Sequence, residues 1–362
     1  MSNWRVDDEA LESIVIGAGI LGTGGGGNPY IGKLTARALL RQGLEVEVIA
    51  LEDVPDEWRV CTVGQMGAPT IGIEKLPRGT ETTDAVRALQ SVLGHEVDAV
   101  IPAEIGGGNS IEPMIVAAHL GIPVIDGDGM GRAFPTLPMI TYHIYGVDCF
   151  PCAVADEKGN QIVYPSGVDV HWLERLSRSA AVQMGGFAGC AVFSMSGSEV
   201  KRTAIGGTLS GARRLGDRVR AARAGREEDA VAGILDATGG RTLFEGKIVD
   251  VDRRTADGWV RGQVELEGTD ADAGARMTVS FQNENLVAWR DGEVVATVPD
   301  LICIVNREDG EPVTTEMLRY GYRVVVLGIP CSELLRTPEA LEVVGPQAFG
   351  YDLPFEPMEV VR

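Results

Sequence analysis

Short apolar runs alternate with amphipathic segments along the first 130 residues of the chain. Apolar positions spaced three and four apart predict helices at residues 7–20, 30–42, 82–93 and 111–120. Short apolar stretches between them predict strands at residues 46–51, 60–63, 97–102 and 122–125. Strands that alternate with helices are typical of a parallel sheet covered by helices on both faces.

The pattern changes after about residue 150. Residues 152–155 and 161–164 flank a polar turn and predict a hairpin, and helices are expected at residues 171–184 and 207–232. From residue 242 onward, short strands separated by Asp-Gly turns indicate antiparallel pairing. We therefore predict an α/β protein. A three-layer parallel-sheet domain should occupy residues 1–165, and a mainly β C-terminal domain with inserted helices residues 166–362.

Charge and composition narrow the classes of partner. The formal net charge of −20 repels phosphate backbones and anionic lipid head groups, so we expect neither nucleic acid nor a membrane as a partner. The polar start lacks the features of a signal peptide, and no apolar run approaches the ~18 residues needed to span a bilayer. We expect a cytoplasmic homo-oligomer. Its cysteines should be reduced, buried thiols, although Cys149 and Cys152 leave a redox or metal pair open.

The sequence GAGILG at residues 17–22 matches the glycine fingerprint of dinucleotide-binding folds. That fold needs a helix to begin at the fingerprint, but four consecutive glycines and Pro29 follow, and neither residue type suits a helix interior. A helix beginning near Pro29 fits better. We therefore expect no nicotinamide or flavin cofactor.

The glycine run is instead predicted to be a substrate-binding loop. Its backbone amides, together with the N-terminus of the following helix, are suited to bind a carboxylate or a developing negative charge. A plain flexible connector is the alternative. The predicted substrate-binding residues of the loop are Thr23, Gly24, Gly25, Gly26 and Gly27.

Three carboxylates follow predicted buried strands. Glu104 and Asp126 should project from the carboxyl edge of the parallel sheet, where open α/β sheets bind ligands, and Asp128 lies two residues further on. We predict a catalytic role for all three. Because like charges repel, one is protonated, or a divalent metal ion binds the three, or Arg132 supplies the counter-charge and contacts substrate. The alternative is that Asp126 and Asp128 cap a turn or the next helix.

Two further polar residues are site candidates. Asn109 follows three glycines and is a candidate substrate-binding residue, with capping of the next helix as the alternative. His143 lies beyond the last glycine-rich turn and is a candidate acid, base or ligand, although a lone histidine is also common in a core.

Four motifs in order resemble those of a known family. They are LGTGGGGNPY at residues 21–30, GAP at 67–69 with EK at 74–75, EIGGGN at 104–109, and DGDGMGRAFP at 126–135. Together they look like the S-methyl thiohydantoin desulfurase family, whose members accompany hydantoinase and oxoprolinase subunits. The resemblance covers essentially the whole chain. One departure is Thr136, where the resemblance leads us to expect an acid after Pro135.

The resemblance implies an enzyme that hydrolyses a five-membered thiohydantoin-like or hydantoin-like ring. Water would attack the carbon between the two ring nitrogens, and a thiol would leave. This step requires an activated water, stabilisation of the tetrahedral intermediate and assistance to the leaving group. The alternative implied by the same resemblance is a non-catalytic ring-binding protein or an accessory partner of a hydantoinase/oxoprolinase-type enzyme.

Overall fold

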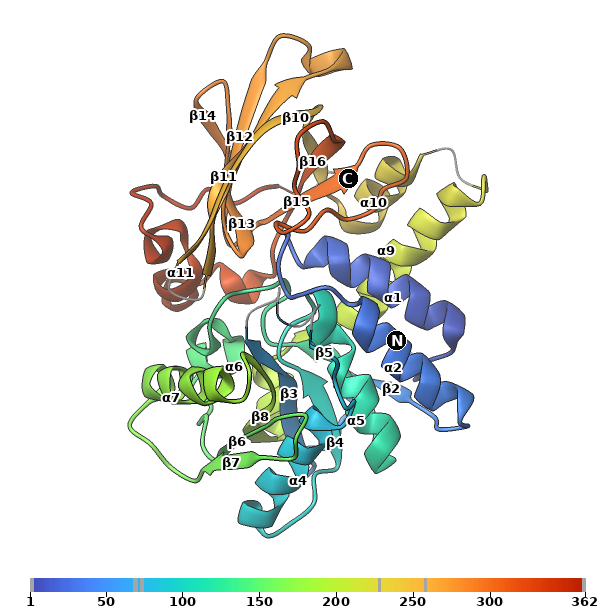
Figure 1. Ribbon diagram of the computed structural model, residues 1–362, viewed down its shortest axis with the longest axis vertical. Helices are drawn as coiled ribbons and strands as arrows, with labels where there is room; N and C mark the ends of the chain where they lie inside the picture. The colour runs from blue at the N-terminus through green and yellow to red at the C-terminus, as the bar shows by residue number, and fades with distance from the viewer. Residues whose placement is uncertain (1–2, 68–70, 72–74, 227–228, 257–258, 360–362) are drawn as a thin grey trace.

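Two β-sheets organise the chain, and the second lies above the first in Figure 1. The computed structural model describes residues 3–67, 71, 75–226, 229–256 and 259–359. The first sheet contains, in spatial order, β1 (Trp4–Arg5), β2 (Glu47–Ala50), β5 (Val124–Asp128), β4 (Ala99–Pro102), β3 (Arg59–Gly67), β8 (Phe187–Ser196), β6 (Cys152–Ala155) and β7 (Gln161–Tyr164), and β9 (Ile205–Gly206) pairs with the end of β5.

Strands β2, β5, β4 and β3 form a parallel core, in which Val48 pairs with Val124 and Val60 with Ala99. The strands on either side of this core, β1 at one edge and β8, β6 and β7 at the other, are antiparallel. The α/β architecture is therefore confirmed, with a mixed sheet in place of a purely parallel one. Strand β8 comes from beyond residue 166, so the two sheets do not divide the chain at the expected boundary.

Helices cover both faces of the first sheet. Successive strand residues alternate between two cores: Val48, Val100 and Val124 face one of them, and their neighbours Ile49, Ile101 and Ile125 face the other. The first face packs against α1 (Asp8–Leu21), α2 (Tyr30–Arg41), α4 (Glu81–Leu93) and α5 (Glu112–Leu120). The other packs against α6 (Thr141–Ile144), α7 (Val170–Gln183) and α8 (Gly197–Thr203). This is the three-layer arrangement that the sequence predicted.

The C-terminal sheet is antiparallel throughout. Its order is β14 (Glu293–Thr297), β13 (Glu284–Arg290), β12 (Arg276–Gln282), β11 (Trp259–Gly268), β10 (Arg241–Ala256), β16 (Arg323–Ile329) and β15 (Leu301–Asn306). Helix α9 (Thr208–Arg223) packs beside α1, α10 (Ala230–Thr238) packs against α9 next to the C-terminal sheet, and α11 (Pro338–Val344) follows β16 (Figure 1). The mainly β C-terminal half is confirmed, although the single helix expected at residues 207–232 is two helices. No helix among the described residues is long and apolar enough to cross a membrane.

The apparent dinucleotide fingerprint is the C-terminal end of α1: Gly17 and Gly19 lie within the helix, Gly22 is its C-cap residue, and the first of them serves helix packing. A Cβ atom on Gly17 would lie 1.9 Å from the carbonyl oxygen of Ala212 in α9, and one on Gly216 would lie 1.9 Å from the carbonyl oxygen of Ser13 in α1. The two helices can therefore approach closely only where both carry glycine. These glycines occur because α1 and α9 touch backbone to backbone.

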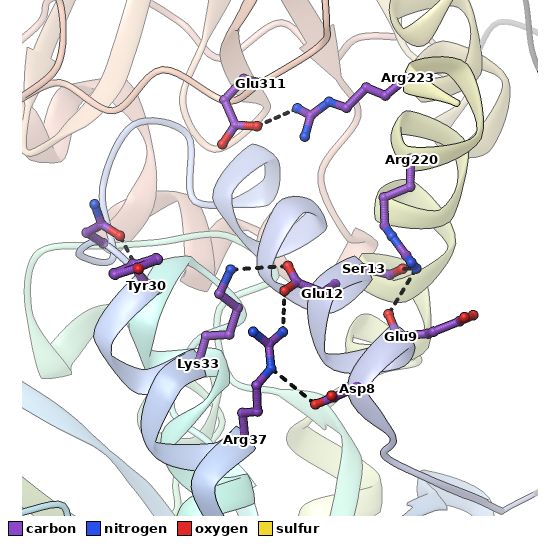
Figure 2. A network of polar contacts seen from close by, with 11 residues as sticks. Asp8, Glu9, Glu12, Ser13, Tyr30, Lys33, Arg37, Arg220, Arg223 and Glu311 are labelled. Atoms are coloured by element: carbon purple, nitrogen blue, oxygen red, sulfur yellow. Dashed lines mark hydrogen bonds and ion pairs between the residues drawn. The ribbon is translucent and has the colours of Figure 1, made fainter. Parts of the chain in front are cut away.

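Charged side chains fix α1 between its two neighbouring helices (Figure 2). Glu12 accepts hydrogen bonds from Lys33 (3.1 Å) and Arg37 of α2. On the other side, Arg220 of α9 donates to the hydroxyl of Ser13 (2.9 Å) and to the carbonyl of Glu9 (3.1 Å). The loop between α1 and α2 is thus held at both ends by anchored helices.

Candidate active site

A pocket of about 240 Å³ opens where the first sheet meets the C-terminal sheet. Its walls come from the loop between α1 and α2, from the carboxyl ends of β3 and β4, from α5 and α7, and from the turn between β12 and β13. We call it the junction pocket. It lies at the carboxyl edge of the parallel strands, where the sequence predicts a ligand site.

The glycine loop, residues 22–28, forms one wall. Three of its glycines adopt a left-handed backbone that favours glycine: φ is +93° at Gly24 and +76° at both Gly26 and Gly27. The amide of Gly108 donates to the carbonyls of Gly26 (2.9 Å) and Gly27 (3.2 Å), which docks the loop onto the segment that follows β4. Within the described part of the chain, the amides of Gly26 and Gly27 donate no hydrogen bond, and both residues line the pocket.

Glu104 leaves the end of β4 and lines the pocket with only 6% of its surface exposed. The side-chain amide of Asn109 donates to its Oε1 (2.5 Å), and the backbone amide of Phe134 donates to its Oε2 (3.1 Å). Burial raises the pKa of Glu104 to about 7, although both donors pull it down. At neutral pH this carboxyl group is therefore divided between its protonated and ionised forms.

Asn109 orients Glu104 and does not cap α5. Its Oδ1 accepts a hydrogen bond from the backbone amide of Gln65 (2.7 Å), while its Nδ2 donates to Glu104. The N-cap residue of α5 is Ile111, whose side chain makes no capping hydrogen bond. Asn109 therefore links the ends of β3 and β4 at the pocket wall.

Glu112 is a second buried acid in the same wall, 5% exposed. Gln65 Nε2 donates to its Oε1 (2.8 Å) and Thr82 Oγ1 donates to its Oε2 (2.5 Å). Burial raises the pKa of Glu112 to about 7, the hydrogen bond from Thr82 opposes this rise, and the nearby charge of Glu81 adds to it. Sequence analysis did not single out Glu112, because an acid in the first turn of a helix is ordinary.

Glu284, the first residue of β13, approaches the pocket from the C-terminal sheet. It is 3% exposed, and its Oε2 has no hydrogen-bond partner among the described residues. Burial raises its pKa well above the usual value, the charge of Glu104 raises it further, and Arg132 opposes the rise. No pattern in the sequence singles out this residue, because only the folded chain brings it to Glu104, 180 positions earlier.

Asp126 and Asp128 do not line the junction pocket. Asp126 Oδ1 accepts a hydrogen bond from the amide of Ser210 (3.1 Å) in the first turn of α9. Asp128 Oδ2 accepts from three backbone amides in the turns after β4 and β5, at 2.7–3.0 Å, and burial raises its pKa to about 7. Both side chains therefore organise local backbone, as the capping alternative supposed.

The predicted metal site does not form. Among the described residues, no three His, Cys, Asp or Glu side chains are placed so that they could hold a metal ion. Glu104 faces the pocket, whereas Asp126 and Asp128 bind backbone amides away from it. The six cysteines are free and buried, as expected of structural thiols.

Arg132 is fully buried and does not line the pocket. Its Nη2 donates to Thr23 Oγ1 (2.8 Å) and to the carbonyl of Asn285 (2.9 Å), and its Nη1 donates to the carbonyl of Asp300 (2.9 Å). Burial lowers its pKa to about 10, and the charge of Glu284 counteracts this. Arg132 thus ties the glycine loop to the C-terminal sheet from a position outside the pocket wall.

His143 also lies outside the pocket. It is half-buried in the short helix α6, and its ring makes a T-shaped contact with that of His171, with 6.5 Å between ring centroids. Burial lowers its pKa, and the charge of His171 lowers it further. The expected catalytic role for His143 therefore finds no support in its position. Thr136, by contrast, does line the pocket. Of the quoted motif residues, Ala68, Pro69 and Glu74 lie outside the described part of the chain.

Fold and pocket together define a two-domain α/β protein with buried acids where its domains meet. The chain belongs to the S-methyl thiohydantoin desulfurase-like (S-Me-THD-like) family: the model of the family's N-terminal domain matches residues 9–166 and that of its C-terminal domain residues 168–358. This confirms the family that the sequence motifs indicated. The fold is also similar to a crystal structure of a protein from Chromobacterium violaceum, with a TM-score of 0.80 and 27% identity over 98% of this chain and 100% of that one. No curated protein matches the chain.

Proposed function

We propose that the chain is a hydrolase that removes sulfur from an S-alkylated five-membered thiohydantoin ring, at the carbon between the two ring nitrogens. The observation that carries this proposal is the pair of buried carboxyl groups, Glu104 and Glu284, in one pocket. Their charges interact, and both have raised pKa values. Two such acids favour a state in which one is protonated and the other ionised, which suits combined acid and base catalysis.

Glu104 is the proposed general base. Its carboxylate takes a proton from water as the water oxygen bonds to the ring carbon, and Glu284, in its acid form, gives its proton to the adjacent ring nitrogen. The intermediate then loses its hydroxyl proton to Glu284 as the carbonyl forms. The carbon–sulfur bond breaks, and the sulfur takes the proton held by Glu104. The products are a hydantoin and a thiol, and both acids return to their starting states.

The division of roles follows from the surroundings of each acid. Glu104 accepts one hydrogen bond on each oxygen, from Asn109 and from the amide of Phe134, and these donors stabilise its ionised form. Glu284 has a buried oxygen without a donor, which favours its protonated form and leaves it free to donate to a ligand. A base near pKa 7 is well matched to neutral pH.

The glycine loop supports the same chemistry. When water attacks, electron density moves onto the ring nitrogen and the neighbouring ring carbonyl. The amides of Gly26 and Gly27 border the pocket and have no acceptor among the described residues. They are suited to stabilise that density, in the manner of an oxyanion hole.

The test is to incubate the purified chain with S-methyl thiohydantoins that differ at C5 and to measure methanethiol release. In ¹⁸O-labelled water, the hydantoin should gain one labelled oxygen. Glu104→Gln and Glu284→Gln should each lower kcat by at least about 10²-fold, comparable to removal of a principal catalytic donor. Glu293→Gln, a surface change on the far hairpin, is the control. Absence of release from every ring, or release unaffected by both site variants, would contradict the proposal. Release that requires an added hydantoinase-type protein would favour the accessory role.

A further inference from the structure

Gln65 is the polar residue of β3 that meets the junction pocket. Its side chain follows those of Cys61 and Val63 on the face of β3 that packs against α4 and α5. Those two side chains are fully buried in the apolar core, whereas Gln65 is only partly buried and lines the pocket. This row of side chains therefore ends in an amide at the pocket wall.

The side-chain amide of Gln65 is held by its nitrogen, and its oxygen is unused. Nε2 donates a hydrogen bond to Oε1 of Glu112 (2.8 Å). Oε1 of Gln65 accepts no hydrogen bond from the described residues, and it is not closed off from solvent. Because the amide is planar, pointing its nitrogen at Glu112 turns its oxygen away from that acid. The pocket that Gln65 lines therefore contains an acceptor without a partner among the described residues.

Glu112 fixes this orientation in both of its protonation states. As a carboxylate it only accepts hydrogen bonds, so Gln65 must present its NH2 group. As an acid it can carry its proton on Oε2, where the hydroxyl of Thr82, 2.5 Å away, rotates to accept it, and Oε1 still accepts from Gln65. Because the pKa of Glu112 is about 7, both states are populated at neutral pH. The Gln65 amide keeps the same orientation in each.

Gln65 is also linked to the proposed base. Asn109 joins the two, because its Oδ1 accepts from the backbone amide of Gln65 (2.7 Å) and its Nδ2 donates to Glu104 (2.5 Å). Glu284 approaches the same base from the C-terminal sheet, and its charge interacts with that of Glu104. A hydrogen-bond acceptor from one domain and an acid from the other therefore line the pocket together with the base.

An S-alkylated thiohydantoin ring presents two different nitrogens beside its reacting carbon. One is an imine nitrogen, which accepts a hydrogen bond, and the other is the N–H group between that carbon and the ring carbonyl, which donates one. In the proposed mechanism, Glu284 in its acid form donates to the imine nitrogen. The group that complements the N–H is an acceptor, and Gln65 Oε1 provides one in the same pocket.

We infer that Gln65 is a substrate-binding residue whose Oε1 accepts a hydrogen bond from the ring N–H, and that Glu112 is the positioning residue that holds it. The inference rests on the proposed function for the identity of the ring. It adds the group that determines which ring nitrogen faces the acid. With the N–H at Gln65 and the imine nitrogen at Glu284, the carbon between them is presented to the water that the base activates.

The first experiment measures kcat/KM for methanethiol release from two S-methyl thiohydantoins with the same C5 arm, one with the ring N–H and one with N-methyl in its place. The wild type should prefer the N–H ring by about tenfold or more, as expected when a hydrogen bond inside a pocket is lost. In Gln65→Met, which has a similar length but no amide oxygen, this preference should disappear. Comparing the ratio between proteins cancels any difference in the intrinsic reactivity of the two rings. A wild-type ratio in Gln65→Met would overturn the inference and leave the hydrolase proposal standing.

The second experiment tests the positioning role of Glu112. In Glu112→Met the Gln65 amide loses its acceptor, so KM for the N–H ring should rise and the preference for that ring should fall. Glu112→Gln should restore the preference, because the new amide accepts from Gln65 through its oxygen and donates to Thr82 through its nitrogen. Glu293→Gln, on an exposed hairpin, is the control and should keep the wild-type ratio. A wild-type ratio in Glu112→Met, or no restoration in Glu112→Gln, would overturn the assignment to Glu112.

A binding measurement separates this inference from the proposed function. Calorimetry with a hydantoin, and with its derivative methylated on the nitrogen between the two ring carbonyls, requires no thiol release. Tighter binding of the unmethylated hydantoin to the wild type, with the difference lost in Gln65→Met, would support the inference even for a chain that hydrolyses no ring. Equal binding of the two hydantoins, or binding of neither, would overturn it whether or not turnover occurs.

Discussion

A Cβ atom on Gly25 would lie 2.1 Å from Oε1 of Glu284. The two residues come from different domains. Their proximity means that the glycine loop lies directly against Glu284, which reaches the pocket from the C-terminal sheet. Gly25 does not adopt a left-handed backbone, unlike its neighbours Gly24, Gly26 and Gly27. Its lack of a side chain is therefore required by this contact and not by its backbone dihedral angles.

The first prediction concerns this contact. In Gly25→Ala, the new methyl group displaces the carboxyl group of Glu284, and kcat should fall by about 10²-fold, comparable to loss of a principal catalytic donor. The control is Gly211→Ala in α9, where the added methyl group would lie 3.9 Å from Nη2 of Arg214, an ordinary contact, and a helix favours alanine. Steady-state kinetics and thermal unfolding of both variants check it. Wild-type turnover in Gly25→Ala would show that catalysis does not require the carboxyl group of Glu284 in its present position.

The sequence was sufficient to predict the glycine loop, because four consecutive glycines before a proline have few structural uses other than backbone geometry. The sequence was also sufficient to predict the alternating strands and helices, because the spacing of their apolar residues can be recognised without knowledge of the tertiary structure. Strand β8 was not predicted. Both of its faces are largely buried, so it lacks the alternation that marks a half-exposed strand.

The sequence could not distinguish which of the candidate acids belongs to the pocket. Glu104, Asp126 and Asp128 look alike in sequence, since each follows a buried strand. What separates them is the partner: Glu104 receives a side-chain amide and faces the pocket, whereas the other two accept backbone amides of a helix start and of turns. Glu284 could not be found at all, because its relation to Glu104 depends on how two domains pack.

The second prediction concerns the pH dependence of catalysis. Glu104 must be ionised to act as a base, so kcat/KM should rise with pH and level off above about 7, the pKa to which burial raises this group. It should fall again only at higher pH, where Glu284 loses its proton, because burial raises that pKa well above its usual value. The two limbs belong to the pair as a whole. A flat profile between pH 5 and 9 would contradict the assignment.

The third prediction concerns the pH dependence of stability. The pKa of Glu112 is about 7 in the folded chain and about 4.3 in the unfolded chain, so the folded state binds more protons between these values. Its contribution to the free energy of unfolding is therefore complete below about pH 4 and is lost as pH rises through 7. Glu104 and Asp128 act in the same direction. We expect the chain to be more stable at pH 5 than at pH 8.

Glu112→Gln checks this sign, because glutamine has no proton to lose. The fall in unfolding free energy between pH 5 and pH 8 should be smaller than in the wild type by about 2 kcal/mol, an order-of-magnitude value for one buried group with this shift. Urea unfolding at the two pH values measures it. Glu293→Gln, an exposed surface change, should keep the wild-type difference. An equal fall in Glu112→Gln and wild type would mean that Glu112 titrates normally.

The fourth prediction concerns Arg132, which we assign to the junction of the domains and not to substrate. Its guanidinium donates to Thr23 and to backbone carbonyls of the C-terminal domain. Its positive charge also lowers the pKa of Glu284, against the effect of burial. In Arg132→Met these acceptors lose their donor inside the protein, and Glu284 loses a compensating cation. The free energy of unfolding should drop by about 3–5 kcal/mol, the range for breaking a buried charged network.

Arg132→Lys should restore little of this stability, because an ammonium group cannot reproduce the planar set of donors that reaches Thr23, Asn285 and Asp300 together. The matched control is Arg87→Met in α4, whose side chain is 52% exposed and whose partner, Asp84, keeps a second ion pair with Arg78 in the variant. Such pairs contribute about 0–1 kcal/mol. The free energies of unfolding of the three variants, measured by urea unfolding, test this prediction. If Arg132→Met were as stable as Arg87→Met but bound substrate poorly, Arg132 would belong to the ligand site that the sequence first suggested.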